Sequence, residues 1–173
     1  EGEGVTFTVS GSELAITLAG VLTFASAPDY ETKSSYTATV TASDDTNSTS
    51  QEITVNITDV NEVPVFTSSA TFNAAENQTA IDTVTATDAD GDAVTFTVSG
   101  SELAITSAGV LTFASAPDYE TKATYTATVT ATDGTNSTTQ AITVNVTNVV
   151  ENSSPVFTSN SSFTVVENQT SAA

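Results

Sequence analysis

The chain has 173 residues, of which 21 are acidic and two basic, for a formal net charge of −19. This charge excludes nucleic acid and anionic membrane surfaces as partners, because both require lysine and arginine. With 38% hydrophobic residues and clean apolar–polar alternation, the sequence indicates a folded chain rather than a disordered acidic tail.

The sequence is an internal duplication. Residues 5–58 recur as residues 94–147 at a constant offset of 89, and residues 64–79 recur as residues 155–170 at an offset of 91. A unit of this length can bury a modest core of its own. Tandem duplication at this period is typical of arrays of small domains, which are usually built for length.

The repeats predict three units: a partial repeat over residues 1–63 that lacks its first strands, a complete repeat over 64–154, and a first-strand fragment over 155–173. Residue 1 aligns with residue 90, inside a repeat, so we expect the sequence to be a piece of a longer protein. No apolar segment suitable for membrane insertion is visible in it.

Short strands with turn residues between them are predicted throughout the complete repeat, and no helical periodicity persists beyond a few residues. Asp133–Asn136 carries the turn chemistry of a hairpin. About seven short strands are the number expected of an immunoglobulin-like sandwich. In chain order the predicted strands are 71–73, 80–87, 94–98, 103–105, 110–113, 125–131 and 141–146.

The acidic residues concentrate in the turns and in the connector between repeats. Such a density of oxygen ligands suits calcium, which takes six to eight of them, better than magnesium, which retains its waters. Zinc is disfavoured because the chain has no Cys or His. The alternative is that these acids only solubilise the protein and form turns. Asp92, which no motif accounts for, is assigned to that alternative.

Five short motifs recur in a fixed order at repeat spacing, and together they resemble tandem cadherin-type repeats of bacterial surface proteins. The motifs are Ala75-Glu76-Asn77, Asp29-Tyr30-Glu31 with its copy Asp118-Tyr119-Glu120, the connector Asp59-Val60-Asn61-Glu62, Asp88-Ala89-Asp90, and Asp133. The resemblance implies an all-β fold of immunoglobulin-like Greek-key β-sandwiches, arranged end to end as a rod. It also implies Ca²⁺ at each junction and a place outside the cell or on its surface.

The resemblance implies two sets of metal ligands. At the first junction they would be Asp29, Glu31, Asp59, Asn61 and Glu62 from one side, and Asp88, Asp90 and Asp133 from the other. At the second junction Glu76, Asp118 and Glu120 are present. Its connector has Asn148 where the first has Asp59, and is two residues longer, so we expect weaker or fewer ions there.

The leading hypothesis is a calcium-stiffened stalk or extender of a surface adhesin or filament, whose partners are the neighbouring repeats of the same chain. One alternative is an adhesion module that binds its own kind or carbohydrate. Another is a filament subunit that binds identical chains head to tail, by donating the strand in residues 155–170.

An enzyme is disfavoured. Without His or Cys, the usual pairs of nucleophile and base cannot be built. Paired carboxylates could hydrolyse glycosides, but identical sites repeated along a rod would be an unusual arrangement for an active site.

Overall fold

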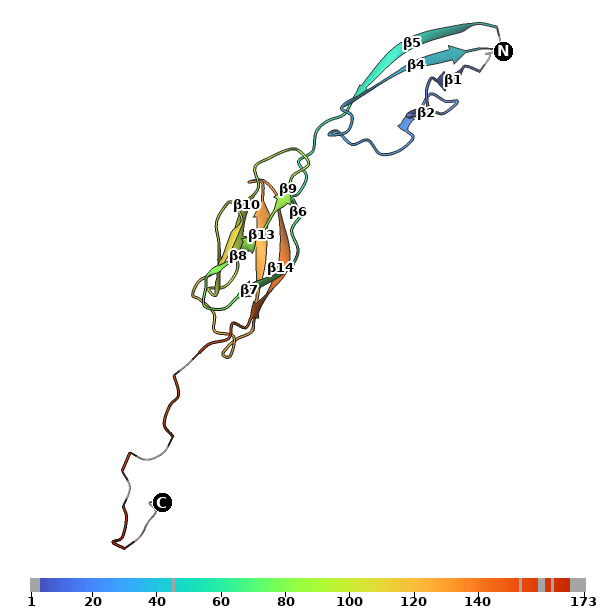
Figure 1. The fold of residues 1–173 in the computed structure, drawn as a ribbon. Coiled ribbons are helices and arrows are strands. Elements are labelled where there is room, and N and C mark those ends of the chain that lie inside the picture. The colour runs from blue at the N-terminus through green and yellow to red at the C-terminus, as the bar shows by residue number, and fades with distance from the viewer. Residues whose placement is uncertain (1–3, 45, 153, 159–160, 163, 169–173) are drawn as a thin grey trace.

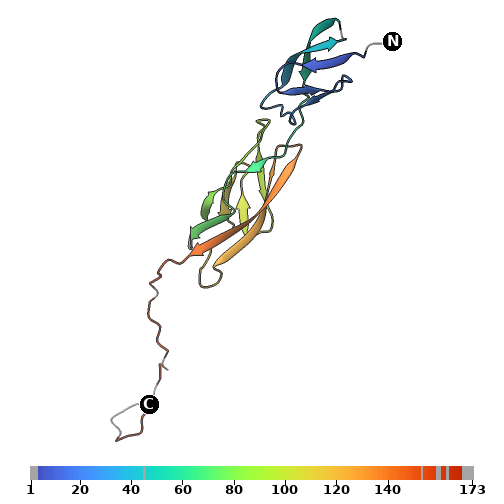
Figure 2. The same ribbon diagram turned by 90° about the vertical axis from the view of Figure 1, so that its right-hand side faces the viewer.

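The computed structural model describes residues 4–44, 46–152, 154–158, 161–162 and 164–168, and these residues form strands and loops without a helix. Two groups of strands lie end to end, as Figures 1 and 2 both show. The residues after the last strand run away from the second group as an extended tail (Figure 1).

The second group of strands is a β-sandwich of two main sheets. One sheet has the order β10 (Thr95–Val98), β13 (Thr124–Thr132), β14 (Ser137–Thr147) and β7 (Thr71–Ala75). The other has the order β11 (Leu103–Ile105), β12 (Val110–Phe113) and β8 (Ala80–Thr83). A small pair, β6 (Val65–Phe66) and β9 (Ala86–Thr87), completes it. The β7–β14 pair is parallel and the others are antiparallel.

Every strand predicted in this repeat is present, and the hairpin is confirmed by the pairing of Thr132 with Ser137 across residues 133–136. The predicted strand over residues 80–87 was wrong as one element. It divides into β8 and β9, because β8 pairs with β12 while β9 pairs with β6. The two-residue strand β6 was not predicted, since a run that short has no readable alternation.

The core of the sandwich is made by the apolar side chains that alternate along both sheets. Leu111, Val84, Val129 and Val144 are each 0% exposed. The sheets approach so closely at Gly109 that a Cβ there would lie 2.2 Å from the carbonyl oxygen of Val84. Gly109 also has φ +88°, so this position excludes a side chain on two grounds.

The first group of strands repeats this architecture with part of it missing. It contains a sheet in the order β1 (Thr6–Val9), β4 (Ser35–Ser43) and β5 (Ser48–Asn56), beside the pair β2 (Leu14–Ile16) and β3 (Leu22–Phe24). The register is conserved between copies, since Phe7 pairs with Ala42 as Phe96 pairs with Ala131. In the part of the chain that the structure describes, nothing takes the places of β7 and β8.

The duplication therefore places one sequence in two environments. Leu22 and Leu111 occupy the same position of the repeat, yet Leu22 is 36% exposed and Leu111 is 0% exposed. We expect Leu111→Ala to lower the free energy of unfolding by roughly 2–5 kcal/mol, because it leaves a cavity in a closed core. Leu22→Ala is the matched control and should have a much smaller effect in urea unfolding. Equal losses would contradict the open core of the first group.

Candidate metal centre

Three acidic side chains from distant parts of the chain meet at the connector between the two groups. Glu31 lies in the loop between β3 and β4, Glu62 in the connector after β5, and Asp90 in the loop between β9 and β10. One carboxylate oxygen of each lies within 4.8 Å of the others. The backbone N–H of Glu62 donates to Oδ2 of Asp90 at 3.0 Å, which fastens the connector to the following repeat.

Asp88 supplies a carboxylate oxygen that the protein itself leaves unsatisfied. Its Oδ1 accepts a hydrogen bond from the backbone N–H of Asp90 at 3.0 Å, which curls the loop so that both carboxylates face the connector. Its Oδ2 is buried and has no hydrogen-bond partner among the described residues. A buried, unpartnered carboxylate oxygen is costly, and a cation is the partner that would remove this cost. The donor set therefore fits a hard metal ion.

The charges at this junction repel one another. Desolvation, followed by repulsion from Asp90 and Asp59, raises the pKa of the Glu62 carboxyl. Glu31's own backbone amide lowers the pKa of its carboxyl, but desolvation and repulsion from Glu62 and Asp59 outweigh it, so this pKa is also raised. The two shifts place Asp59 close enough to act on both glutamates. The cluster consequently favours any cation or proton that reduces its negative charge.

Asp29 holds its own loop in shape beside the cluster. Its two carboxylate oxygens accept hydrogen bonds from the backbone N–H and the hydroxyl of Thr32, at 3.1 and 3.0 Å, and these bonds lower its pKa. Together with Glu31 and Glu62, Asp29 lines a recess between this loop and the connector, closed on one side by Ala89.

Asn61, Asp133 and Asn136 form a second attachment, here termed the connector latch. Oδ1 of Asp133 accepts from the backbone N–H groups of Thr135 and Asn136, both at 2.6 Å, and its Oδ2 accepts from the amide of Asn61 at 2.9 Å. The amide of Asn136 donates to the carbonyl oxygen of Asn61 at 2.8 Å. Asn136 was missed as a junction residue, although its position in the hairpin next to Asp133 offered a signal.

At the other end of the second repeat, Glu76, Asp118 and Glu120 form a second cluster, again with oxygens within 4.8 Å of one another. Glu76 is only 3% exposed. Its Oε2 accepts from the backbone N–H of Tyr119 at 2.9 Å, and its Oε1 accepts from that of Val149 at 2.7 Å. Glu76 thereby joins the loop before β13 to the chain that leaves β14.

The change from Asp59 to Asn148 alters this second cluster chemically. The amide of Asn148 donates to Oε1 of Glu120 at 2.6 Å, so a residue that would supply negative charge here supplies a hydrogen-bond donor. Asp118, like Asp29, satisfies its own loop, through the backbone and hydroxyl of Thr121. The geometry supports the expectation of weaker or fewer ions at this end.

The two lysines, which are the only bases in the sequence, are committed elsewhere. Nζ of Lys33 pairs with Glu13 at 2.6 Å and lies 4.5 Å from the ring centroid of Tyr36. Lys122 makes the same two contacts in the second repeat, and its acidic partner, like Glu13, belongs to neither cluster. The carboxylates of both junctions are therefore without a basic neighbour in the described part of the chain.

The connector latch generates a prediction about pH. The backbone amide of Asn136, the amide of Asn61 and the backbone amide of Thr135 lower the pKa of Asp133 from its ordinary value of 3.8. The charged carboxylate thus stabilises the fold above pH 3.8, and this contribution is lost as the pH falls through the lowered pKa. Asp133→Ala should lower the melting temperature at neutral pH in chelator, and the difference from the wild type should vanish in acid.

Asp44→Ala is the matched control for this prediction. Asp44 closes the equivalent turn of the first repeat by accepting from the backbone N–H groups of Thr46 and Asn47, at 2.8 and 2.5 Å. No asparagine from a preceding connector contacts it among the residues described. Asp133→Ala should therefore be the more destabilising change, and an equal or larger effect of Asp44→Ala would contradict the latch.

Comparisons with known proteins agree with this architecture. The structure resembles human protocadherin-24 EC1-2, with TM-score 0.63, 21% identity, and coverage of 85% of this chain and 83% of that one. It also resembles *Drosophila* N-cadherin EC1-4, with TM-score 0.62, 24% identity, and coverage of 86% and 42%. The chain thus spans less than half of the N-cadherin structure. No curated protein matches the sequence.

Among the residues that the structure describes, no helix is long and apolar enough to cross a membrane. A family model described as a bacterial Ig domain matches residues 61–147, just over half of the chain. This match covers the connector and the complete sandwich. The chain belongs to the bacterial Ig domain family, and it folds as tandem cadherin-like β-sandwich repeats.

Proposed function

We propose that the chain is a non-catalytic extender of a cell-surface adhesin or filament, and that calcium stiffens the junctions between its repeats. Its repeats are taken as residues 1–63, 64–154 and 155–173. The observation that carries this proposal is the convergence of Glu31, Glu62 and Asp90 at the connector, next to the unsatisfied oxygen of Asp88. These groups come from both sides of the connector, so a ligand that binds them all would couple the two repeats.

The residues that would hold the ion at the first junction divide into two sets. The preceding repeat and the connector contribute oxygens from Asp29, Glu31, Asp59, Asn61 and Glu62, and the following repeat contributes Asp88, Asp90 and Asp133. Bound calcium would supply the positive charge that this part of the structure lacks. All of the donors are carboxylate or amide oxygens, the ligands that calcium prefers.

The connector latch gives the junction a direction before any ion binds. The hydrogen bonds of Asn61 with Asp133 and Asn136 hold the connector on the second repeat. The loop that carries Asp29 and Glu31 belongs to the first repeat. We therefore expect calcium mainly to restrain the first repeat against a connector that is already fixed to the second.

The structural role is favoured over a catalytic one by the chemistry of the sequence and by the placement of the acids. The chain has no His or Cys, and each acidic cluster lies where one repeat gives way to the next chain segment. Calcium sites of extracellular modules typically bind at about 10⁻⁴–10⁻³ M, which suits the calcium level outside cells. Extracellular or cell-surface placement is part of the proposal.

The first prediction is a calcium-specific gain in thermal stability. A ligand that binds the native state and not the unfolded chain stabilises it by about 2.7 kcal/mol at one hundred times its Kd. The melting temperature should therefore rise in calcium relative to chelator, and magnesium at the same concentration should reproduce little of the rise. Identical melting curves in calcium and chelator would leave the acids with the solubilising role alone.

The second prediction concerns Glu62→Gln, which should have opposite effects with and without calcium. The pKa of Glu62 is raised by desolvation and by repulsion from Asp90 and Asp59, so removing its charge relieves repulsion in chelator. In calcium the same change removes a ligand. We expect a higher melting temperature than the wild type in chelator and a smaller calcium-induced rise.

Glu52→Gln is the matched control, because Glu52 is an exposed residue of β5 that belongs to neither cluster. It removes one negative charge from the same chain and should leave the calcium-induced rise intact. If Glu52→Gln and Glu62→Gln behaved alike, net charge rather than a site at the connector would explain the calcium response.

A further inference from the structure

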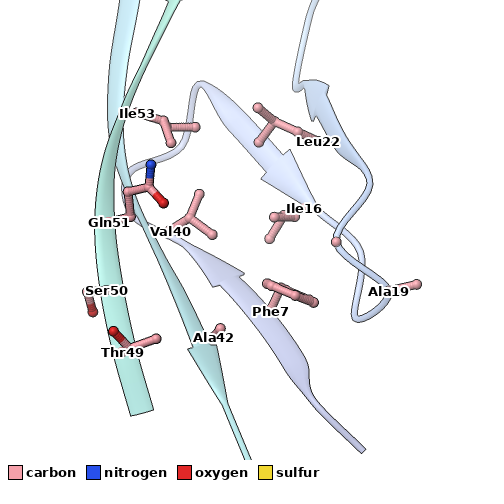
Figure 3. Close-up of a pocket in the computed structure, with 11 residues that line it drawn as sticks. Phe7, Ile16, Ala19, Leu22, Val40, Ala42, Thr49, Ser50, Gln51 and Ile53 are labelled. Carbon is pink, nitrogen blue, oxygen red and sulfur yellow. The ribbon is translucent and has the colours of Figure 1, made fainter.

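The sheet of the first repeat has an apolar face that is open in the described structure. Figure 3 shows Phe7, Ile16, Leu22, Val40 and Ile53 directed into the space between the β1–β4–β5 sheet and the β2–β3 pair. In the second repeat the equivalent side chains belong to the closed core, where Leu111 and Val129 are 0% exposed and Ile142 is 2% exposed. The face is therefore built to be covered.

The second repeat shows which strand covers it. β7 lies parallel to β14, with Phe72 opposite Val144 and Ala74 opposite Val146. Phe72 and Ala74 are each 6% exposed, whereas Asn73 between them points to solvent. The strand thus adds its backbone to the edge of β14 and places alternate side chains in the core.

The first repeat presents the same edge without a partner. β5 is the copy of β14, and in the described structure it pairs only with β4. β5 ends at Asn56, whereas β14 continues to Thr147, whose counterpart is Thr58. The extra residues of β14 are those that pair with Ala74 and Ala75 of β7. An unpaired edge of this kind is a template for an added strand.

The missing strand has a copy at the other end of the chain. At the offset of 91, Ala74, Ala75 and Glu76 of the β7 region correspond to Val165, Val166 and Glu167. In this segment the described residues form no strand, and Val165 and Val166 are 48% and 72% exposed. The tail therefore carries a β-prone apolar sequence without a sheet to join.

We propose that the 173-residue chain binds a second copy of itself head to tail, with the tail segment 164–168 of one copy added in parallel to β5 of the next. The two offsets set the register: Val165 lies opposite Ile57, as Ala74 lies opposite Val146. Val165 then faces the open apolar face, and Val166 faces solvent. A donor from another molecule is favoured because the tail leaves the second repeat at the end away from β5 (Figure 1).

Glu167 adds a polar contact to this register. It occupies the place of Glu76, whose carboxylate accepts from the backbone N–H of Tyr119 in the second repeat. The corresponding N–H in the first repeat is that of Tyr30, next to Glu31. Glu167 would also add its charge to Asp29 and Glu31, as Glu76 does to Asp118 and Glu120. This calcium-dependent part rests on the proposed function, whereas strand addition does not.

Sedimentation equilibrium of the full chain in chelator tests strand addition alone. The average mass should rise with concentration over the range of about 1 to 500 µM, as expected of a small interface. Val165→Asp should abolish the rise, because it places a charge against the apolar face. Val166→Asp, its matched control, should leave the rise intact. A mass that stays monomeric throughout, or equal effects of the two variants, would overturn the proposal.

A mixing experiment guards against a variant that simply fails to fold. Ile57→Asp should block the accepting edge and Val165→Asp the donating tail, so each alone should be monomeric. Their mixture should form a one-to-one dimer and nothing larger, because one intact edge and one intact tail remain. No dimer in the mixture would contradict the assigned edge and tail.

Glu167→Gln separates this inference from the calcium proposal. It should leave association in chelator close to that of the wild type and reduce the gain that calcium gives. If calcium changes nothing for either protein, the calcium proposal fails while strand addition stands. If association is absent in chelator and in calcium, strand addition fails, and the melting experiments still decide the calcium proposal.

Discussion

Electrostatic repulsion among carboxylates at the connector is the constraint on which the junction depends. Glu31, Glu62 and Asp90 are brought together by three separate loops, while both lysines of the chain are paired elsewhere. The fold supplies backbone amides and the connector latch as partial compensation, but the repulsion remains visible in the raised pKa of Glu62. A junction with this much uncompensated charge is suited to respond to a cation.

The duplication allows packing to be separated from sequence. β1 to β5 keep the registers of their copies in the second repeat, so local strand pairing is an attribute of the repeated sequence itself. Closure of the core is not, because Leu22 and Leu111 share a position and differ in burial. Closure requires β7 and β8, which come from residues that precede the duplicated stretch.

The prediction of the candidate site from sequence was uneven for a physical reason. Acidic residues in turns can be recognised from composition, and structure places Glu31 with Glu62 and Asp90 as a group. The sequence offered no way to see that Asp88 Oδ2 would be buried without a partner, or that Asn136 would bind the connector. Both depend on how loops from different strands approach one another.

The sequence by itself determined the all-β class, the tandem organisation, the strands of the complete repeat and the hairpin at residues 133–136, because alternation and turn chemistry are local. Only the tertiary structure decided which carboxylates share a cluster, which oxygens already have partners and which apolar face stays open. These outcomes depend on contacts between residues far apart in the chain, such as Asn61 with Asp133. Sequence periodicity carries no information about such distances, whereas packing of the two sheets fixes them.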